Sequence, residues 1–127
     1  MFSHIMIGAQ RIQQSRAFYD AILGTLEHAP GIADEKGRIF YMSLTPPLIV
    51  GEPIDGKPAT GANGGTIGFS AGDSATVDAW FAQGLAHGGT ECEDPPGFRT
   101  GNKGRSYYAA YLRDPAGNKV CAVYHPK

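Results

Sequence analysis

The chain has 127 residues, a length that suits one compact domain with a substantial buried core. Its 11 Lys and Arg residues against 12 Asp and Glu residues give a net charge of −1, which argues against nucleic acid and anionic membranes as partners. No apolar run is long enough for a membrane span, and no basic stretch followed by an apolar run indicates a secretory signal. Two cysteines make no disulfide framework, so we expect a reduced, cytoplasmic setting.

The first half of the chain contains one helical pattern among short strand patterns. Residues 3–8 alternate, are rich in Ile and end at Gly8, which is typical of a strand. From Ile12 to Leu23 the apolar residues recur at helical spacing, and Gly24 is expected to end the helix. Shorter strands are expected at three further places: residues 25–28, 38–44 and 48–52.

A glycine- and proline-rich segment over residues 53–64 predicts a linker between two half-modules of a single domain, residues 1–52 and 65–127. A second helix is expected to begin at a cap formed by Asp73 or Ser74. The other elements of this half follow in chain order: a strand over 66–70, a short strand over 90–93, a loop over 94–104, a strand over 106–113, a turn over 114–118 and a strand over 119–124.

The start of the chain is repeated, with changes, 62 positions later. Residues 4–9 align with residues 66–71, and the aromatic residues of the two expected helices keep the same offset. A constant offset over a strand and a helix indicates one supersecondary unit used twice. In this alignment His4, a metal ligand or base by residue type, is matched by Thr66, which is a poor ligand.

Each half therefore has the order strand, helix, strand, strand, strand, which is an α+β arrangement. One half alone would leave a face of its sheet uncovered. We expect the two halves, side by side, to form an open, curved mixed sheet with the helices outside. The concave face of that sheet is the natural place for a pocket.

Two short motifs carry a resemblance to a known family. Ser15-Arg16-Ala17-Phe18-Tyr19 in the first helix resembles an S-x-x-F-Y stretch, and Asp114-Pro115-Ala116-Gly117-Asn118 resembles a D-P-x-G-N hairpin. With the paired half-modules, they make nearly the whole chain similar to the vicinal-oxygen-chelate superfamily of glyoxalase, bleomycin-resistance and extradiol-dioxygenase proteins. The resemblance implies paired βαβββ modules and says much less about a reaction. Turn chemistry accounts for the hairpin, so Asp114 is given no catalytic role.

The resemblance also implies where a divalent metal would bind. Metal-dependent members take ligands from the first and last strands of each half; His4 matches the first position, and Cys121 stands where a Glu would follow the hairpin. Glu52 is the nearest candidate at the end of the first half, as a ligand or as a base. His4, Glu52 and Cys121 could bind Zn²⁺ with an open fourth position, since a Cys ligand suits zinc better than Mg²⁺ or Mn²⁺. In the alternative, no metal is bound, Cys121 is a small core residue, and His4 is a general base or a strand-end histidine.

The wall of the expected pocket is aromatic. The candidate substrate-binding residues on the predicted strands are Phe40, Met42, Tyr107, Tyr108 and Tyr111. Alternation puts some of them on the concave face, but the sequence leaves open which parity faces inward.

A second candidate for substrate binding is the loop over residues 93–105, which holds Arg99, Lys103 and Arg105 among glycines. Such a loop could clamp an anionic substrate, for example a carboxylate or a glutathione adduct. The simpler alternative is a solvated surface loop.

Three functions follow from the resemblance. The first is a lactoylglutathione-lyase-like lyase or isomerase that acts on a small oxygenated substrate in the concave cleft and depends on a divalent metal. The second is a non-catalytic small-molecule-binding protein of the bleomycin-resistance kind, without a metal, and the third is a structural or regulatory dimer. Extradiol dioxygenase activity is the least expected, because it needs a two-His, one-carboxylate iron site. The resemblance also implies a homodimer.

Overall fold

A computed structural model describes all 127 residues as two helices and nine strands. The elements, in chain order, are β1 (Ile5–Gly8), α1 (Ile12–Thr25), β2 (Ile32–Ala33), β3 (Ile39–Tyr41), β4 (Leu48–Gly51), β5 (Thr66–Ser70), α2 (Ser74–Ala86), β6 (Thr90–Glu91), β7 (Gly97–Thr100), a 3₁₀ turn (Asn102–Gly104), β8 (Ser106–Arg113) and β9 (Lys119–Tyr124). The predicted α+β class with paired modules is confirmed. Neither helix is long and apolar enough to cross a membrane.

The strands form two mixed sheets, one in each half of the chain. Sheet A has the order β1-β4-β3-β2, and β1 runs parallel to β4. Sheet B has the order β5-β9-β8-β6, and β5 runs parallel to β9. The strands predicted over 66–70, 106–113 and 119–124 are confirmed at those bounds.

The loop predicted over residues 94–104 contains a strand. Strand β7 pairs with the first half of β8, with Gly97 opposite Ala109 and Thr100 opposite Ser106. Strand β6 occupies only the far end of the same edge, opposite Leu112 and Arg113. Because β8 is eight residues long, the part of its edge that β6 leaves free offers main-chain partners to a second short strand. The local sequence of residues 97–100 does not predict that strand.

The predicted strand over residues 25–28 is wrong, because α1 continues through Gly24 to Thr25. The N–H of Glu27 donates to the carbonyl of Gly24 and the N–H of His28 to that of Leu23, while Glu27 has a φ of 68°. These two bonds with a left-handed residue between them are the Schellman termination of a helix. A glutamate thus takes the position at which a glycine is usually expected.

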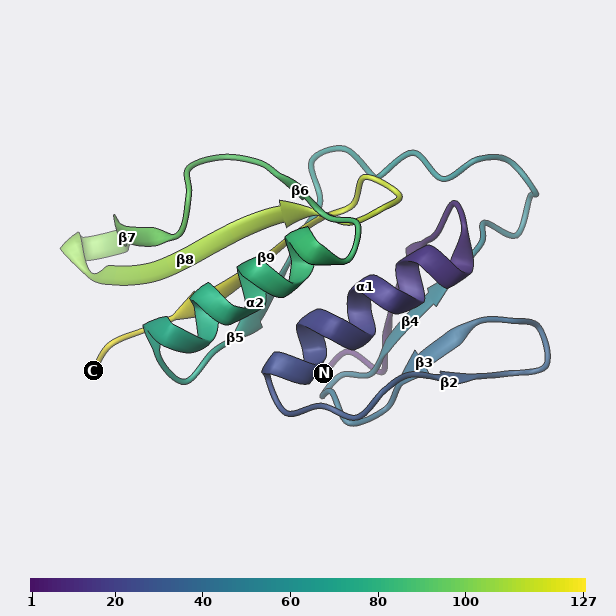
Figure 1. Ribbon diagram of the computed structural model, residues 1–127, viewed down its shortest axis with the longest axis horizontal. Coiled ribbons are helices and arrows are strands. Elements are labelled where there is room, and N and C mark those ends of the chain that lie inside the picture. The colour runs from purple at the N-terminus through teal and green to yellow at the C-terminus, as the bar shows by residue number, and fades with distance from the viewer.

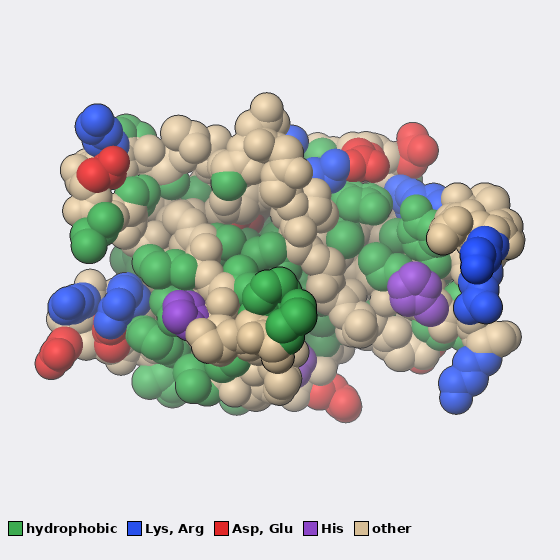
Figure 2. Space-filling model, turned by 180° about the vertical axis from the view of Figure 1, so that it is seen from behind, with side chains coloured by type: hydrophobic (Ala, Val, Ile, Leu, Met, Phe, Trp, Pro, Cys, Tyr) green, Lys and Arg blue, Asp and Glu red, His purple; other side chains and the backbone are tan.

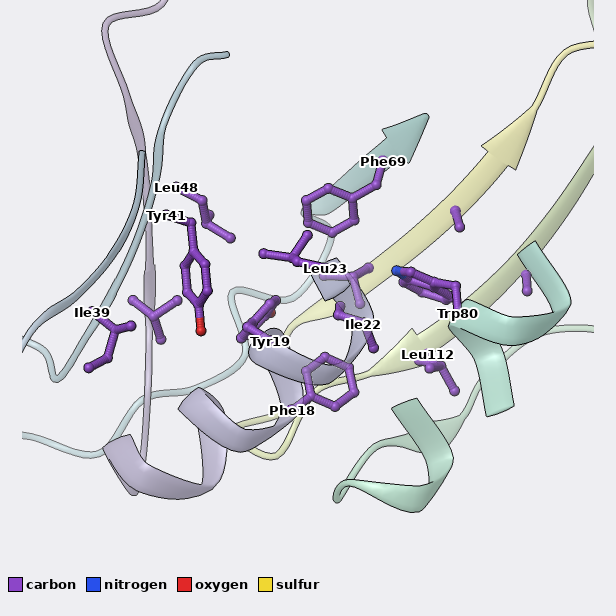
Figure 3. Close-up of a cluster of buried hydrophobic side chains, with 14 of the residues drawn as sticks. Phe18, Tyr19, Ile22, Leu23, Ile39, Tyr41, Leu48, Phe69, Trp80 and Leu112 are labelled. Atoms are coloured by element: carbon purple, nitrogen blue, oxygen red, sulfur yellow. The ribbon is translucent and has the colours of Figure 1, made fainter. Parts of the chain in front are cut away.

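The two helices lie side by side on one side of the molecule, and the two sheets lie behind them (Figure 1). Gly84 of α2 permits this close packing, because a β-carbon there would collide with Leu112 and approach Phe18 to 3.3 Å. The side chains between helices and sheets form one core of sixteen buried residues, which includes Phe18, Ile22 and Trp80 (Figure 3). The opposite faces of both sheets carry no helix, and we call them the rear faces.

A carboxylate stands at the start of α2 and another in the turn of the last hairpin. The first caps the helix, and the second is buried. Of the two predicted caps of α2 it is Asp73 that accepts the N–H of Thr76, at 2.8 Å. Hydrogen bonding to the side chain and then to the main chain of Thr76 lowers the pKa of Asp73. Asp114, 4% exposed, accepts the N–H groups of Ala116 and Asn118 within its own turn. Its role in this turn is structural, as the turn motif predicts.

Candidate ligand-binding face

The alternation of β8 decides which tyrosines face the rear. The Tyr108 hydroxyl donates to Asp78 of α2 at 2.7 Å, so Tyr108 points to the helix side, and this bond raises its pKa. Tyr107 and Tyr111 therefore point to the rear face of sheet B. Of the three candidate tyrosines, two share the open face and Tyr108 does not.

Tyr111 lies at the centre of a polar cluster on the rear face of sheet B. The guanidinium carbon of Arg99 lies 5.4 Å from the centre of its ring and the ammonium of Lys119 lies 5.1 Å from it, both within cation–π range. Lys119 also forms an ion pair with Glu93, and Cys121 is the register partner of Tyr111 on β9. We call Arg99, Tyr111, Lys119 and Cys121 the Tyr111 cluster.

Arg99 is anchored rather than free to clamp an anion. Its guanidinium donates to the carbonyls of Asp94 at 2.8 Å, Gly97 at 3.0 Å and Pro95 at 3.3 Å, and to that of Ala109 on β8. These bonds engage both terminal nitrogens of the guanidinium and hold the segment before β7 against the sheet. What the guanidinium still offers is its flat surface, which suits stacking with an aromatic or π-rich group. The sequence leaves a mobile clamp or a solvated loop open here; in the structure the Arg99 side chain is held against the sheet by these carbonyls.

Burial governs the two titratable groups of the cluster that carry no permanent charge. It raises the pKa of the Cys121 thiol, which is 5% exposed, and it also raises the pKa of the Tyr111 phenol. Since the thiolate is the form that attacks electrophiles and binds metals, the protonated Cys121 is a poor nucleophile and a poor ligand. Lys119 and Glu93 were missed from the sequence, although Lys119 shares the parity of Cys121 on β9.

The rear face of sheet A is apolar except for His4 and Arg38. Ile5, Leu48 and Val50 point toward α1 and the core, so the residues that alternate with them point to the rear. These rear-facing residues are His4, Met6, Ile32, Phe40, Met42 and Ile49, together with Arg38, whose guanidinium carbon lies 5.4 Å from the centre of the Phe40 ring. Met6 is 47% exposed and Met42 is 64% exposed. Seen from behind, hydrophobic side chains lie over both halves of the molecule, with charged groups mainly toward the margins (Figure 2).

The proposed metal ligands do not converge within the chain. Because β1 and β4 are parallel and Ile5 lies opposite Leu48, His4 lies beside Pro47 at the start of the strand pair. Glu52 follows the far end of β4, about 16 Å away at roughly 3.3 Å per residue. Cys121 belongs to sheet B. The chain contains no group of three or more His, Cys, Asp or Glu side chains that could hold a metal ion.

The surroundings of His4 and of Glu52, taken one at a time, also differ from those of metal ligands. His4 is exposed, and its Nδ1 lies 2.7 Å from the Ser3 hydroxyl. Glu52 is exposed and borders a shallow hollow of about 130 Å³ beside the segment that follows β4. The residues present therefore do not fit the zinc set of His4, Glu52 and Cys121, and we assign no chemistry through it.

Comparison with known proteins places the chain in a family. The profile of the Glyoxalase/Bleomycin resistance protein/Dioxygenase superfamily matches residues 1–122, so the chain belongs to this superfamily. A glyoxalase/bleomycin resistance protein from Albidiferax ferrireducens T118 is 50% identical, with 98% of this chain and 99% of that chain covered and a TM-score of 0.92. A comparison with curated proteins gives no match.

Two more distant structures share the fold. A glyoxalase-related enzyme from Fulvimarina pelagi is 18% identical, with 99% of this chain and 88% of that chain covered and a TM-score of 0.75. The lactoylglutathione lyase from Agrobacterium tumefaciens is 24% identical, with 98% and 92% covered and a TM-score of 0.66. At these identities the likeness concerns the fold and carries no activity to this chain.

Proposed function

We propose that the chain is a metal-independent binder of a flat, partly apolar small molecule, and that it binds this ligand on the rear faces of its sheets. The observation that carries the proposal is the Tyr111 cluster. A guanidinium that lies over a tyrosine ring, with both terminal nitrogens bonded to carbonyls, presents a flat cationic surface to a π-rich ligand. The protonated Cys121 beside it adds an apolar, unreactive wall.

A homodimer is the assembly that this proposal uses. The apolar rear face of sheet A exposes Met6, Ile32 and Met42, which are 47%, 69% and 64% exposed. Contiguous exposed apolar side chains on a sheet favour association with another surface. We propose that a second copy of the chain covers part of this face and joins its Tyr111 cluster to the apolar residues of the first.

The second candidate function is a lyase or isomerase acting on a small oxygenated substrate. One observation favours it: the imidazole of His4 is exposed on the rear face. Its Nδ1 lies near the Ser3 hydroxyl, and its Nε2 forms no hydrogen bond within the chain. In that position the imidazole could transfer a proton as a general base. This function needs turnover, which binding alone does not.

The test is a calorimetric and thermal-shift titration with planar, partly polar ligands, including peptide and polycyclic antibiotics, in the presence and absence of EDTA. A binding ligand should raise the melting temperature equally in both conditions. Replacing Arg99 with Lys keeps the charge and removes the flat surface, and Tyr111→Leu removes the ring. Both should weaken binding, by about tenfold for the loss of one stacking contact.

The matched control is Tyr108→Phe, because Tyr108 lies on the same strand and faces α2. It should leave ligand binding unchanged. If EDTA abolishes binding, or if Tyr108→Phe weakens it as much as Tyr111→Leu does, the proposal of a metal-independent rear-face site fails. Turnover of a small oxygenated substrate that is lost in His4→Ala would favour the second candidate instead.

A further inference from the structure

A cavity of about 390 Å³ lies between the two modules. Its apolar wall includes Ile5 at the start of β1, Leu26 at the end of α1, and Ile67 and Phe69 of β5. These side chains point toward the helix layer, so the cavity opens at the seam between the sheets. Its wall adjoins the Tyr111 cluster at Gly68, which is the register partner of Cys121. Its volume falls within the range of small-molecule sites.

Comparison of the two repeats shows that the side chains at this end of the seam differ from those at the other end. At the other end of the seam, the side-chain amide of Asn118 donates to the carbonyl of Gly8 at 2.7 Å. The mate of Gly8 at the offset of 62 is Ser70, which lines the cavity. Register makes Pro46 the mate of Asn118, since each lies two residues before the partner of Ile5 or Ile67.

A proline at this position has no amide side chain to donate. The side-chain amide that bonds to Gly8 at one end of the seam therefore has no equivalent at the end where Pro46 lies. The same holds for the bond from the Tyr19 hydroxyl to Asp114, because the mate of Tyr19 is Phe81, which has no hydroxyl. The cavity therefore lies at the position that, at the other end of the seam, is filled by the side chains of Asn118, Asp114 and Tyr19.

Main-chain groups on this wall lack a strand partner. Strand β5 pairs only with β9, and the N–H of Ala71 donates to Val123 on that side. In a parallel ladder alternate residues point their main-chain groups to opposite edges. The N–H and C=O groups of Gly68 and Ser70 therefore point to the free edge of β5, where both residues border the cavity.

The rim of the cavity places no negatively charged side chain against a bound anion. No Asp or Glu lines it, and its one ionisable lining residue is His28, whose Nδ1 lies 2.9 Å from the hydroxyl of Ser43. With the Gly68 and Ser70 main-chain donors, these groups can receive a carboxylate while the apolar wall covers the rest of a small molecule. We propose that this cavity is a second ligand site, which binds a small aromatic or short-chain carboxylic acid independently of the rear-face ligand.

The chain provides its own reporter for this site. Trp80 is the single tryptophan, it is fully buried, and its Nε1 has no hydrogen-bond partner. It shares the core with Phe69, which forms part of the cavity wall (Figure 3). A ligand against Phe69 should therefore change the fluorescence of Trp80.

The experiment titrates the full chain with 3-phenylpropionate, and in parallel with 3-phenylpropylamine and 3-phenylpropanamide, while Trp80 fluorescence and amide NMR shifts are recorded. The carboxylate should give a saturable change and bind at least about tenfold more tightly than the amine. The NMR shifts should concentrate on residues 26–28 and 67–70. Binding of the amine as tight as that of the carboxylate, shifts centred on other residues, or no saturable change up to about 10 mM, a very weak Kd, would overturn the proposal.

Variants separate this site from the rear face. Leu26→Phe fills the cavity and should abolish binding, while the exposed Leu85→Phe, its control on α2, should not. His28→Gln should weaken carboxylate binding by about tenfold and leave amide binding unchanged. Tyr111→Leu should have no effect, so failure of the rear-face proposal leaves this result intact. If Leu26→Phe does not fold, the shift map of the unaltered chain decides.

Discussion

The hydroxyl of Tyr19 donates to the carboxylate of Asp114 at 2.6 Å, across 95 residues of sequence. Tyr19 is fully buried on α1, and Asp114 belongs to the turn between β8 and β9. The bond therefore ties the helix of the first module to the last hairpin of the second. Two motifs that carry the resemblance to the superfamily meet at this contact.

Tyr19→Phe should destabilise the protein by about 2 kcal/mol, because it leaves one oxygen of a buried carboxylate with fewer donors. Urea unfolding followed by circular dichroism measures this change. The control is Tyr107→Phe, on the rear face, which should change the free energy of unfolding by less than about 0.5 kcal/mol. Equal stability of Tyr19→Phe and the unaltered chain would contradict a role for this bond in joining the modules.

Alkaline pH should destabilise the protein through its buried tyrosines. Burial raises the pKa of Tyr19 and, together with Asp20, that of Tyr41. A raised folded pKa means that this stabilisation is complete below the pKa of unfolded tyrosine, about 10, and is lost as the pH rises from there toward the folded values. Urea midpoints should stay level from pH 8 to about 9.5 and fall above it. In Tyr19→Phe the urea midpoint should fall less steeply with pH. An equal slope in the two proteins would argue against a contribution from Tyr19.

Two glycines in the helices should respond in opposite ways to alanine. Gly84→Ala should destabilise by about 2 kcal/mol or more, since the new methyl group would overlap Leu112 in a packed core. Gly24→Ala should stabilise by about 0.5–1 kcal/mol, because Gly24 lies inside α1 with open space around it and alanine favours the helix. Thermal unfolding of the two variants checks both signs, and the same sign for both would be inconsistent with this packing.

The two cysteines should differ in reactivity. Cys92 is half-buried, whereas Cys121 is buried with a raised pKa. A thiol reagent at pH 8 should therefore modify Cys92 at least about tenfold faster, because only the thiolate reacts. Mass spectrometry of partly labelled protein, with Cys92→Ser as the control, measures the two rates. Faster labelling of Cys121 would indicate an activated thiol and would contradict its assignment as an inert wall.

Much of the fold follows from local sequence, and the exceptions have physical causes. Residues 106–113 and 119–124 are apolar, alternating segments bounded by turns, so their strands were predictable at their ends. The end of α1 was not, because Glu27 adopts a conformation that the sequence assigns to glycine. Strand β7 depends on an edge of β8 that only the tertiary structure provides.

The candidate site was less predictable than the fold. Aromatic strands were recognisable, but the parity of Tyr107, Tyr108 and Tyr111 is set by packing against α2. The anchoring of Arg99 depends on carbonyls that local sequence cannot show. His4 and Glu52 fall at opposite ends of a parallel strand pair, a relation fixed by register and invisible in their residue types.

Metal-independent binding can be tested by the metal content of protein purified without an affinity tag, together with a zinc titration. We predict less than about 0.1 equivalent of any divalent metal per chain and no zinc binding that depends on His4, because the nearby ligands that a zinc site needs are lacking. One equivalent of bound metal per chain that disappears in His4→Ala would contradict it.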